Sequence, residues 1–172
     1  LVQSDTACKE ENDHSLYSIP SFYAECGSKS IAIPSHIDVR YDYSSYDKLI
    51  PLGLKMILKH SYCDMKTSGW TCLGTSRALE EYPVDCKDTN VTMVATFPSC
   101  WNGVALESAD MSHMRYPEAN SSCPYCHPVK IPKLTITVTY NATKGRSVKP
   151  EVHAEAWCAV LALPFPLSLI HI

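Results

Sequence analysis

The sequence predicts a mainly β domain, built as a two-sheet sandwich or a jelly-roll-like fold, with one short helix and an extended N-terminal arm. Two observations carry this prediction. Hydrophobic residues make up 45% and charged residues 19% of the 172 residues, which is the balance of a globular chain. Several segments also alternate apolar and polar residues with the two-residue period of a strand that buries one face. Two packed β layers have cores built from such alternation.

The N-terminal third begins with a polar segment and continues into the first strand. Residues 1–30 are rich in Ser and Glu and lack periodicity, so we expect an N-terminal arm or loop-rich segment there. Residues 31–172 are then expected to form a single β-rich glycoprotein domain. Residues 36–43 alternate, which predicts a half-buried strand with these residues on one face: Ile37, Val39, Tyr41 and Tyr43.

A short helix is expected near residues 48–60. Asp47 is a residue type that caps helices, and Pro51 suits a first helical turn. The second half of the chain returns to strand patterns, at residues 91–97 and 134–140. A further strand is expected from Val152 to Leu163.

Nine cysteines are scattered over the whole chain, a number that a cytosolic protein rarely carries. If four disulfides form, one cysteine is left over, which in a secreted protein suggests an intermolecular bond or a reactive thiol. Cys8 and Cys126 are the candidates for that spare residue. The connectivity stays open, and the disulfide candidates are Cys8, Cys26, Cys63, Cys72, Cys86, Cys100, Cys123, Cys126 and Cys158.

Three sequons add to the evidence for a secretory route. Asn90, Asn120 and Asn141 each stand two residues before Ser or Thr, with no Pro between. We therefore expect N-linked glycans and an extracellular, secreted protein. The chain begins at Leu1 without Met, which we interpret as a mature N-terminus.

Charge and hydropathy exclude two classes of partner. The net charge is −3 and no block of Lys and Arg occurs, whereas binding to nucleic acid needs a basic stripe. The most apolar stretch, residues 156–170, is shorter than a membrane span and is interrupted by Pro164 and Pro166. We interpret it as buried strand rather than as a membrane span.

The run Cys123-Pro-Tyr-Cys126-His127 matches both a haem-attachment motif and a redox dithiol motif. Both chemistries usually place the motif at the start of a helix, but Pro128 and Pro132 follow, and then a strand pattern. A zinc site would need a second close pair of ligands, and Cys63 and Cys72 are poorly spaced for it. We therefore favour structural disulfides in a loop, with no metal and no cofactor apart from glycans.

A possible carbohydrate site is the remaining candidate for chemistry. Asp110 and His113, close in sequence to Trp101, could line a polar cleft. The alternative is a surface loop with a buried Trp. No catalytic residue is assigned, and the candidate set is Trp101, Asp110, His113 and Tyr116.

Residues 97–138 contain four blocks that resemble a known family. The blocks are Phe97-Pro-Ser-Cys100-Trp101-Asn-Gly103, Ser112-His113-Met-Arg-Tyr116-Pro117, Cys123-Pro124 and His127-Pro128-Val129-Lys-Ile-Pro132-Lys-Leu134. Their order and spacing are similar to the C-terminal half of the secreted domain-of-unknown-function family numbered nineteen ninety-six. That family is widespread in fungi and often stands beside WSC carbohydrate-binding domains. The resemblance implies an extracellular, carbohydrate-associated β fold.

Departures from the family pattern argue against an enzyme. The family usually has Asp where this chain has Asn102, and often has Asp at Glu107 and His at Met111. The sequons, the odd cysteine, the free-looking N-terminal segment and the lack of a catalytic set make one function the leading expectation. It is an extracellular matrix or fibril (filament) subunit that self-associates into a polymer by arm or strand exchange. The alternative is a carbohydrate-binding or carbohydrate-degrading extracellular domain.

Overall fold

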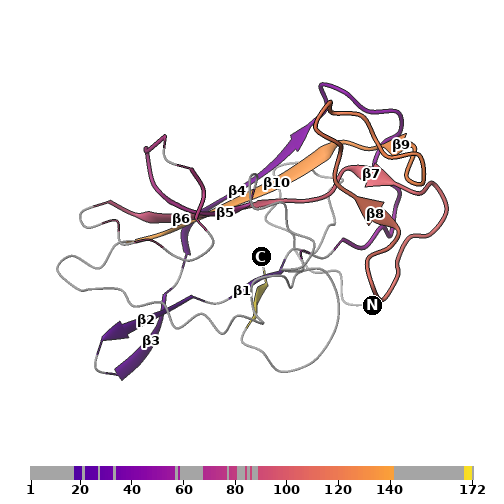
Figure 1. The fold of residues 1–172 in the computed structure, drawn as a ribbon. Helices are drawn as coiled ribbons and strands as arrows, with labels where there is room; N and C mark the ends of the chain where they lie inside the picture. Colours follow the sequence, from indigo (N-terminus) through magenta and orange to yellow (C-terminus); the bar gives the residue numbers. More distant parts are fainter. Residues whose placement is uncertain are drawn as a thin grey trace.

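The chain is mainly β in the computed structural model, which describes residues 18–20, 22–26, 28–32, 34–56, 58, 68–76, 78–80, 84, 86, 89–141 and 169–171. A four-stranded sheet forms the centre, with strand order β4-β10-β6-β5, and all of its pairs are antiparallel (Figure 1). Its strands are β4 (Pro34–Asp42), β5 (Gly69–Cys72), β6 (Val91–Thr96) and β10 (Lys133–Tyr140).

The smaller sheets are also antiparallel. A three-stranded sheet of order β8-β7-β9 consists of β7 (Cys100–Trp101), β8 (Met114–Arg115) and β9 (Val129–Lys130). Two two-stranded sheets pair β2 (Phe22–Cys26) with β3 (Ser28–Ala32), and β1 (Ser18–Pro20) with β11 (Leu169–His171). In Figure 1 the β7–β9 strands lie beyond one end of the central sheet, and the β2–β3 hairpin lies toward the other.

The alternation predicted from the sequence sets which face of the central sheet is apolar. Strands β4, β6 and β10 lie where strands are expected, at residues 36–43, 91–97 and 134–140. Two expected end residues lie outside them: β4 ends at Asp42 and leaves Tyr43 exposed, and β6 ends one residue before Phe97. The register pairs Ile136 with Val39 on one side and with Ala95 on the other, so apolar residues of three strands share a face. That face forms the core together with residues from the loops, and its buried members include Trp70, Met93, Phe97, Leu134, Val138 and Tyr140.

The opposite face of the sheet is rich in threonine. Thr96 and Thr135 lie side by side on it, with their hydroxyl oxygens 3.4 Å apart. Ser68 extends this polar network, because its hydroxyl accepts a hydrogen bond from the Thr96 N–H and donates one to the Thr96 carbonyl. Thr92, on the same face, is buried.

The short helix expected near residues 48–60 is not confirmed. Residues 48–56 and 58 contain turns and no helix, and Gly53 has a φ of 82°. The groups that would have built the helix are used elsewhere: the Asp47 carboxylate accepts the N–H of Lys130, and the Lys55 N–H donates to the carbonyl of Leu106. Tertiary hydrogen bonds therefore override the local signals for a helix.

The extended N-terminal arm is not confirmed either. The described part of residues 1–30 forms strands β1 and β2 and the start of β3, which pair antiparallel with partners in the same chain. Residues 1–17 and the strand expected from Val152 to Leu163 lie outside the described residues. Within the described part of the chain, no helix has the length and hydropathy needed to cross a membrane.

Candidate functional site

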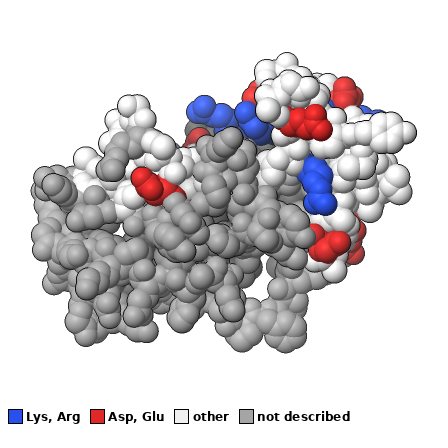
Figure 2. All heavy atoms as spheres, in the orientation of Figure 1, with Lys and Arg blue, Asp and Glu red and all other residues white. Residues whose placement is uncertain are grey.

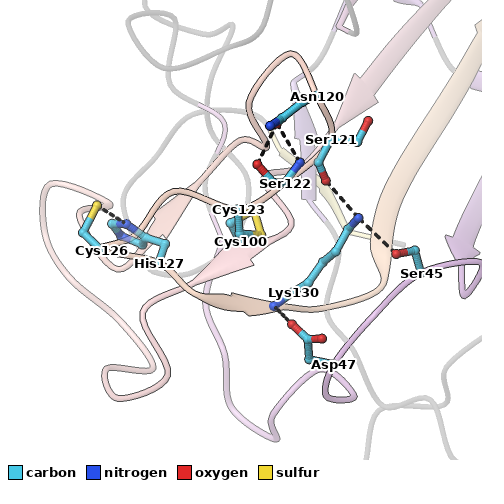
Figure 3. Close-up of a disulfide and its surroundings, with 10 residues drawn as sticks. All are labelled: Ser45, Asp47, Cys100, Asn120, Ser121, Ser122, Cys123, Cys126, His127 and Lys130. Carbon is cyan, nitrogen blue, oxygen red and sulfur yellow. Dashed lines mark hydrogen bonds between the residues drawn. A yellow bond between two sulfur atoms is a disulfide. The ribbon is translucent and has the colours of Figure 1, made fainter.

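The candidate site is the segment of residues 97–132, called here the loop cluster. It carries β7, β8 and β9 and the four family-like blocks, except for the last two residues of the fourth block, Lys133 and Leu134, which begin β10. A disulfide between Cys100 on β7 and Cys123 closes a loop of 23 residues, with the two Cα atoms 5.5 Å apart (Figure 3). Closing a loop of this length stabilises the folded state by about 3.4 kcal/mol in the chain-entropy treatment. The loop cluster is thus fixed by a covalent cross-link at its base.

The other cysteines divide into three groups. A second disulfide joins Cys72 on β5 to Cys86, a separation of 14 residues. Cys126 is free and exposed. Cys26 lies on β2, and Cys8, Cys63 and Cys158 lie outside the described residues.

The Cys-Pro-Tyr-Cys run does not form a dithiol–disulfide pair. Cys123 bonds to Cys100 and leaves Cys126 as a single thiol. The sulfur of Cys126 lies 3.1 Å from Nδ1 of His127 (Figure 3). Nε2 of His127 lies 2.6 Å from the carbonyl oxygen of Ser112. The His127 side chain is buried, with 5% of the residue exposed.

Trp101 is part of the core. It is 7% exposed, and its Nε1–H donates to the Ala105 carbonyl at 2.7 Å. The side-chain oxygen of Asn102 accepts the N–H groups of Val104 and Ala105, which shapes the turn after β7. Gly103 allows this turn because its φ is 80° and a side chain would meet Val129.

His113 connects the loop cluster to the segment around Lys55. The residue is 1% exposed, with Nδ1 of its ring 2.7 Å from the Ser108 hydroxyl and Nε2 2.7 Å from the Lys55 carbonyl oxygen. Because a carbonyl only accepts, Nε2 carries the hydrogen and Nδ1 accepts from Ser108. An ion pair between Lys55 and Glu107 strengthens the same junction. His113 therefore acts here as a structural residue.

Asp110 and Tyr116 also use their polar atoms within the loops. The Asp110 carboxylate is exposed and accepts the Ser112 N–H at 3.0 Å. Hydrogen bonds from Ser112 hold the pKa of Asp110 at about 2, below its ordinary 3.8. The Tyr116 hydroxyl donates to the Thr96 carbonyl at 2.8 Å.

The four residues of the expected carbohydrate site are thus close in the chain but do not present one open polar surface. Buried Trp101 leaves no exposed ring face for a sugar, and His113 points its ring nitrogens at Ser108 and Lys55. Among the described residues, no group of three or more His, Cys, Asp or Glu side chains is placed to hold a metal ion.

The structure brings together residues that sequence analysis missed. The Lys130 amine donates to the Ser45 hydroxyl and to the Ser121 carbonyl, each at 3.1 Å, and so fastens the Asn120 loop to the segment after β4 (Figure 3). In that segment Tyr43 and Tyr46 are 55% and 43% exposed, with ring centroids 5.9 Å apart. Only the surplus of aromatic residues after β4 could have indicated this pair.

The three sequons differ in exposure. Asn120 is exposed, and its side-chain oxygen accepts hydrogen bonds from the N–H and the hydroxyl of Ser122 (Figure 3). Asn141 is exposed directly after β10, while Asn90 is half-buried directly before β6. Figure 2 shows that acidic and basic residues are interspersed on the visible face of the described part, where no single-sign patch forms.

The model of a family described as "Domain of unknown function (DUF1996)" matches residues 2–161, a much longer stretch than the 97–138 that carried the resemblance in the sequence. No curated protein and no solved structure shows significant similarity to the chain.

Proposed function

The chain belongs to the family Domain of unknown function (DUF1996), and from this premise we propose that it is a secreted, N-glycosylated structural subunit of an extracellular matrix or filament. The observation that carries the proposal is the edge of the central sheet at β4. Within the described residues, β4 pairs on one side with β10 and with no strand on the other. A nine-residue edge strand offers a row of main-chain groups to which another strand can add.

The charges along β4 favour a second copy of β4 as the added strand. If two copies pair antiparallel about Val39, Asp38 of each copy lies opposite Arg40 of the other. His36 then lies opposite Asp42, so the match extends along the polar face. Opposite charges directly across a strand pair stabilise it, by about 0.2–1 kcal/mol each. The Asp38 and Arg40 side chains are 49% and 77% exposed and only 3.9 Å apart within one copy, so both can exchange partners.

Such a contact is two-fold symmetric and joins two central sheets into one. A two-fold contact closes on itself, so a filament requires a second contact of each copy with another neighbour. The buried threonines of β6 support the further proposal of a two-sheet sandwich, because both faces of this strand are covered. Disulfides at Cys100–Cys123 and Cys72–Cys86 support an oxidising, extracellular location.

Glycans at Asn120 and Asn141 fit the same proposal. Both side chains are exposed, so a bulky polar sugar at either position displaces no core residue. Enzymatic removal of N-glycans from protein secreted by eukaryotic cells is expected to lower its mass. Asn120→Gln and Asn141→Gln should each reduce this loss of mass by the mass of one glycan. Protein that is secreted without any sugar would contradict this part of the proposal.

The test of self-association is a charge exchange on β4. The full chain would be secreted from eukaryotic cells and studied by sedimentation over a range of concentrations, with electron microscopy of the assemblies. Arg40→Glu places like charges opposite each other at two pairs. Each pair changes from about 0.5 kcal/mol favourable to about 0.5 kcal/mol unfavourable. The two pairs together weaken the contact by about 2 kcal/mol, which raises the dissociation constant about 30-fold.

The matched control is Asp38→Arg combined with Arg40→Asp. This double variant exchanges the two charges, restores both opposite-charge pairs across the contact and should assemble like the unmodified chain. A chain that is monomeric at every concentration would refute the proposal. So would an Arg40→Glu variant that assembles as well as the double variant.

A second candidate function, carbohydrate binding, is supported by Tyr43 and Tyr46. Exposed aromatic rings offer apolar faces on which sugar rings can lie, and the hydroxyl of Ser45 stands between them in the chain. Tyr125→Ala is the control, because it also removes one exposed tyrosine. Loss of binding to a glycan array in Tyr43→Ala, with binding kept in Tyr125→Ala, would favour this candidate. Equal binding by both variants would count against it.

A further inference from the structure

Cys126 stands in an unusual setting for an unpaired cysteine. It is exposed at a turn of the loop cluster, three residues after Cys123, whose disulfide anchors the loop to β7. Its neighbour Tyr125 is fully exposed, so the turn projects into solvent. An incoming molecule can therefore reach the sulfur, while the base of the loop stays fixed.

The imidazole of His127 is oriented as a base toward this sulfur. The Ser112 carbonyl oxygen, 2.6 Å from Nε2, can only accept, so Nε2 carries the ring hydrogen and Nδ1 presents its lone pair. The Cys126 sulfur lies 3.1 Å from Nδ1 and donates its S–H to it. Because His127 is buried and held by Ser112, the ring is fixed in this orientation. A nucleophile, a base and a group that orients the base are the parts of an activated thiol.

We propose that Cys126 and His127 form a thiol–disulfide exchange site for an accessible disulfide, such as glutathione disulfide or a mixed disulfide on a second copy of this chain. The proton of Cys126 passes to Nδ1 of His127, and the thiolate attacks one sulfur of the incoming disulfide. A new S–S bond forms as the old one breaks, and the leaving thiolate takes the proton from His127. The exchange conserves disulfides, so no further oxidant is needed.

Two successive exchanges join two chains. The first converts Cys126 to a mixed disulfide with a small thiol, and the thiolate of a second copy then displaces that small thiol. The sum converts two chain thiols and one small disulfide into one chain–chain disulfide and two small thiols. Since Cys123 is bonded to Cys100, no neighbouring thiol of the Cys-Pro-Tyr-Cys run resolves the mixed disulfide within the chain. The site is independent of the β4 contact, although a Cys126 link would add a second two-fold contact to each copy.

The test measures the reaction of the secreted full chain with glutathione disulfide, followed by acid quenching and mass spectrometry. Near pH 7 we expect one glutathione adduct on the peptide that contains Cys126, and none there in Cys126→Ser. His127→Gln should slow the reaction about tenfold or more, because a positioned base commonly contributes at least that much. Near pH 10, where solvent deprotonates thiols, this difference should disappear. His36→Gln, which changes an exposed histidine on β4, should react like the unmodified chain.

The design separates the two sources of disulfide and allows for misfolding. Disulfide-linked dimers on non-reducing gels, absent in Cys126→Ser, identify a second copy of the chain as the partner. Glutathione adducts without such dimers identify the small thiol as the partner. If His127→Gln fails to fold, the unmodified chain is compared before and after unfolding in urea, and the native rate should be about tenfold higher or more. Equal native and unfolded rates, or no change in His127→Gln near pH 7, would overturn the proposal. Neither result bears on the β4 contact, which Arg40→Glu tests separately.

Discussion

Replacing Thr92 by Val should stabilise the central sheet. Thr92 lies on β6, between β5 and β10, and is 4% exposed. Its hydroxyl has no hydrogen-bond partner among the described residues. A buried polar group without a partner costs about 1–3 kcal/mol, and Val has nearly the same shape without the hydroxyl. We expect a gain of about 1 kcal/mol, equivalent to a rise in Tm of about 2–4 °C for a chain of this size.

The experiment must separate the hydroxyl from the sugar, because Thr92 completes the sequon of Asn90. Asn90→Gln serves as the reference, since that variant cannot carry an N-linked glycan at position 90. Asn90→Gln with Thr92→Val should unfold at a higher temperature than Asn90→Gln alone. Asn90→Gln with Thr92→Ser keeps the hydroxyl but loses a buried methyl group. It should be less stable than Asn90→Gln alone by about 1 kcal/mol. Calorimetry measures all three proteins.

A lower stability of the Thr92→Val protein in this background would refute the reasoning. It would mean that the hydroxyl makes a favourable hydrogen bond, since loss of one typically costs about 1 kcal/mol. Equal stabilities of the Val and Ser proteins would also contradict it, because they differ in both the hydroxyl and the packing of a methyl group.

Four further predictions concern the loop cluster and the core. Ser112→Ala should raise the pKa of Asp110 from about 2 toward 3.8, as measured by NMR titration, whereas Ser112→Thr should keep it low. Because the pKa of Asp110 in the folded state is depressed, its contribution to stability is present above pH 3.8 and is lost as the pH falls through about 2. Asp110→Asn should remove this pH dependence of stability, as measured by acid unfolding curves. Replacing both Cys100 and Cys123 by Ser should lower the free energy of unfolding in urea by about 3 kcal/mol, and no loss would contradict the loop-closure estimate. Burial raises the pKa of Tyr140, so its phenol should stay protonated until alkaline unfolding, and its ultraviolet absorbance should change only with that transition.

The strands and their faces could be predicted from the sequence because their signal is local. The apolar residues Leu134, Ile136, Val138 and Tyr140 recur at every second position, and a strand places alternate residues on one face whatever its neighbours are. The same holds for Ile37 and Val39 on β4. The family resemblance depended on short blocks with fixed residues, and the family match extends far beyond them.

The helix expected near residues 48–60 is not confirmed, because the residues that suggested it make tertiary contacts instead. Asp47 resembles a helix cap in sequence, but its carboxylate meets Lys130, 83 residues away. The role of His113 was missed for the same reason. A histidine near Asp110 suggests a polar cleft in sequence, while its actual partners, Ser108 and the Lys55 carbonyl, are set by the way two loops meet.

The sequence alone determined that the chain is rich in β-strands, which face of β10 is apolar, and where the sequons and cysteines stand, because each of these depends on residues a few positions apart. Only the tertiary structure decided that Cys100 pairs with Cys123, that Cys126 stays free beside His127, and that β4 lies at the edge of the central sheet in the part of the chain that the structure describes. These features depend on distances between atoms far apart in the chain, and a disulfide or a hydrogen bond forms only when folding brings its two partners within a few ångströms.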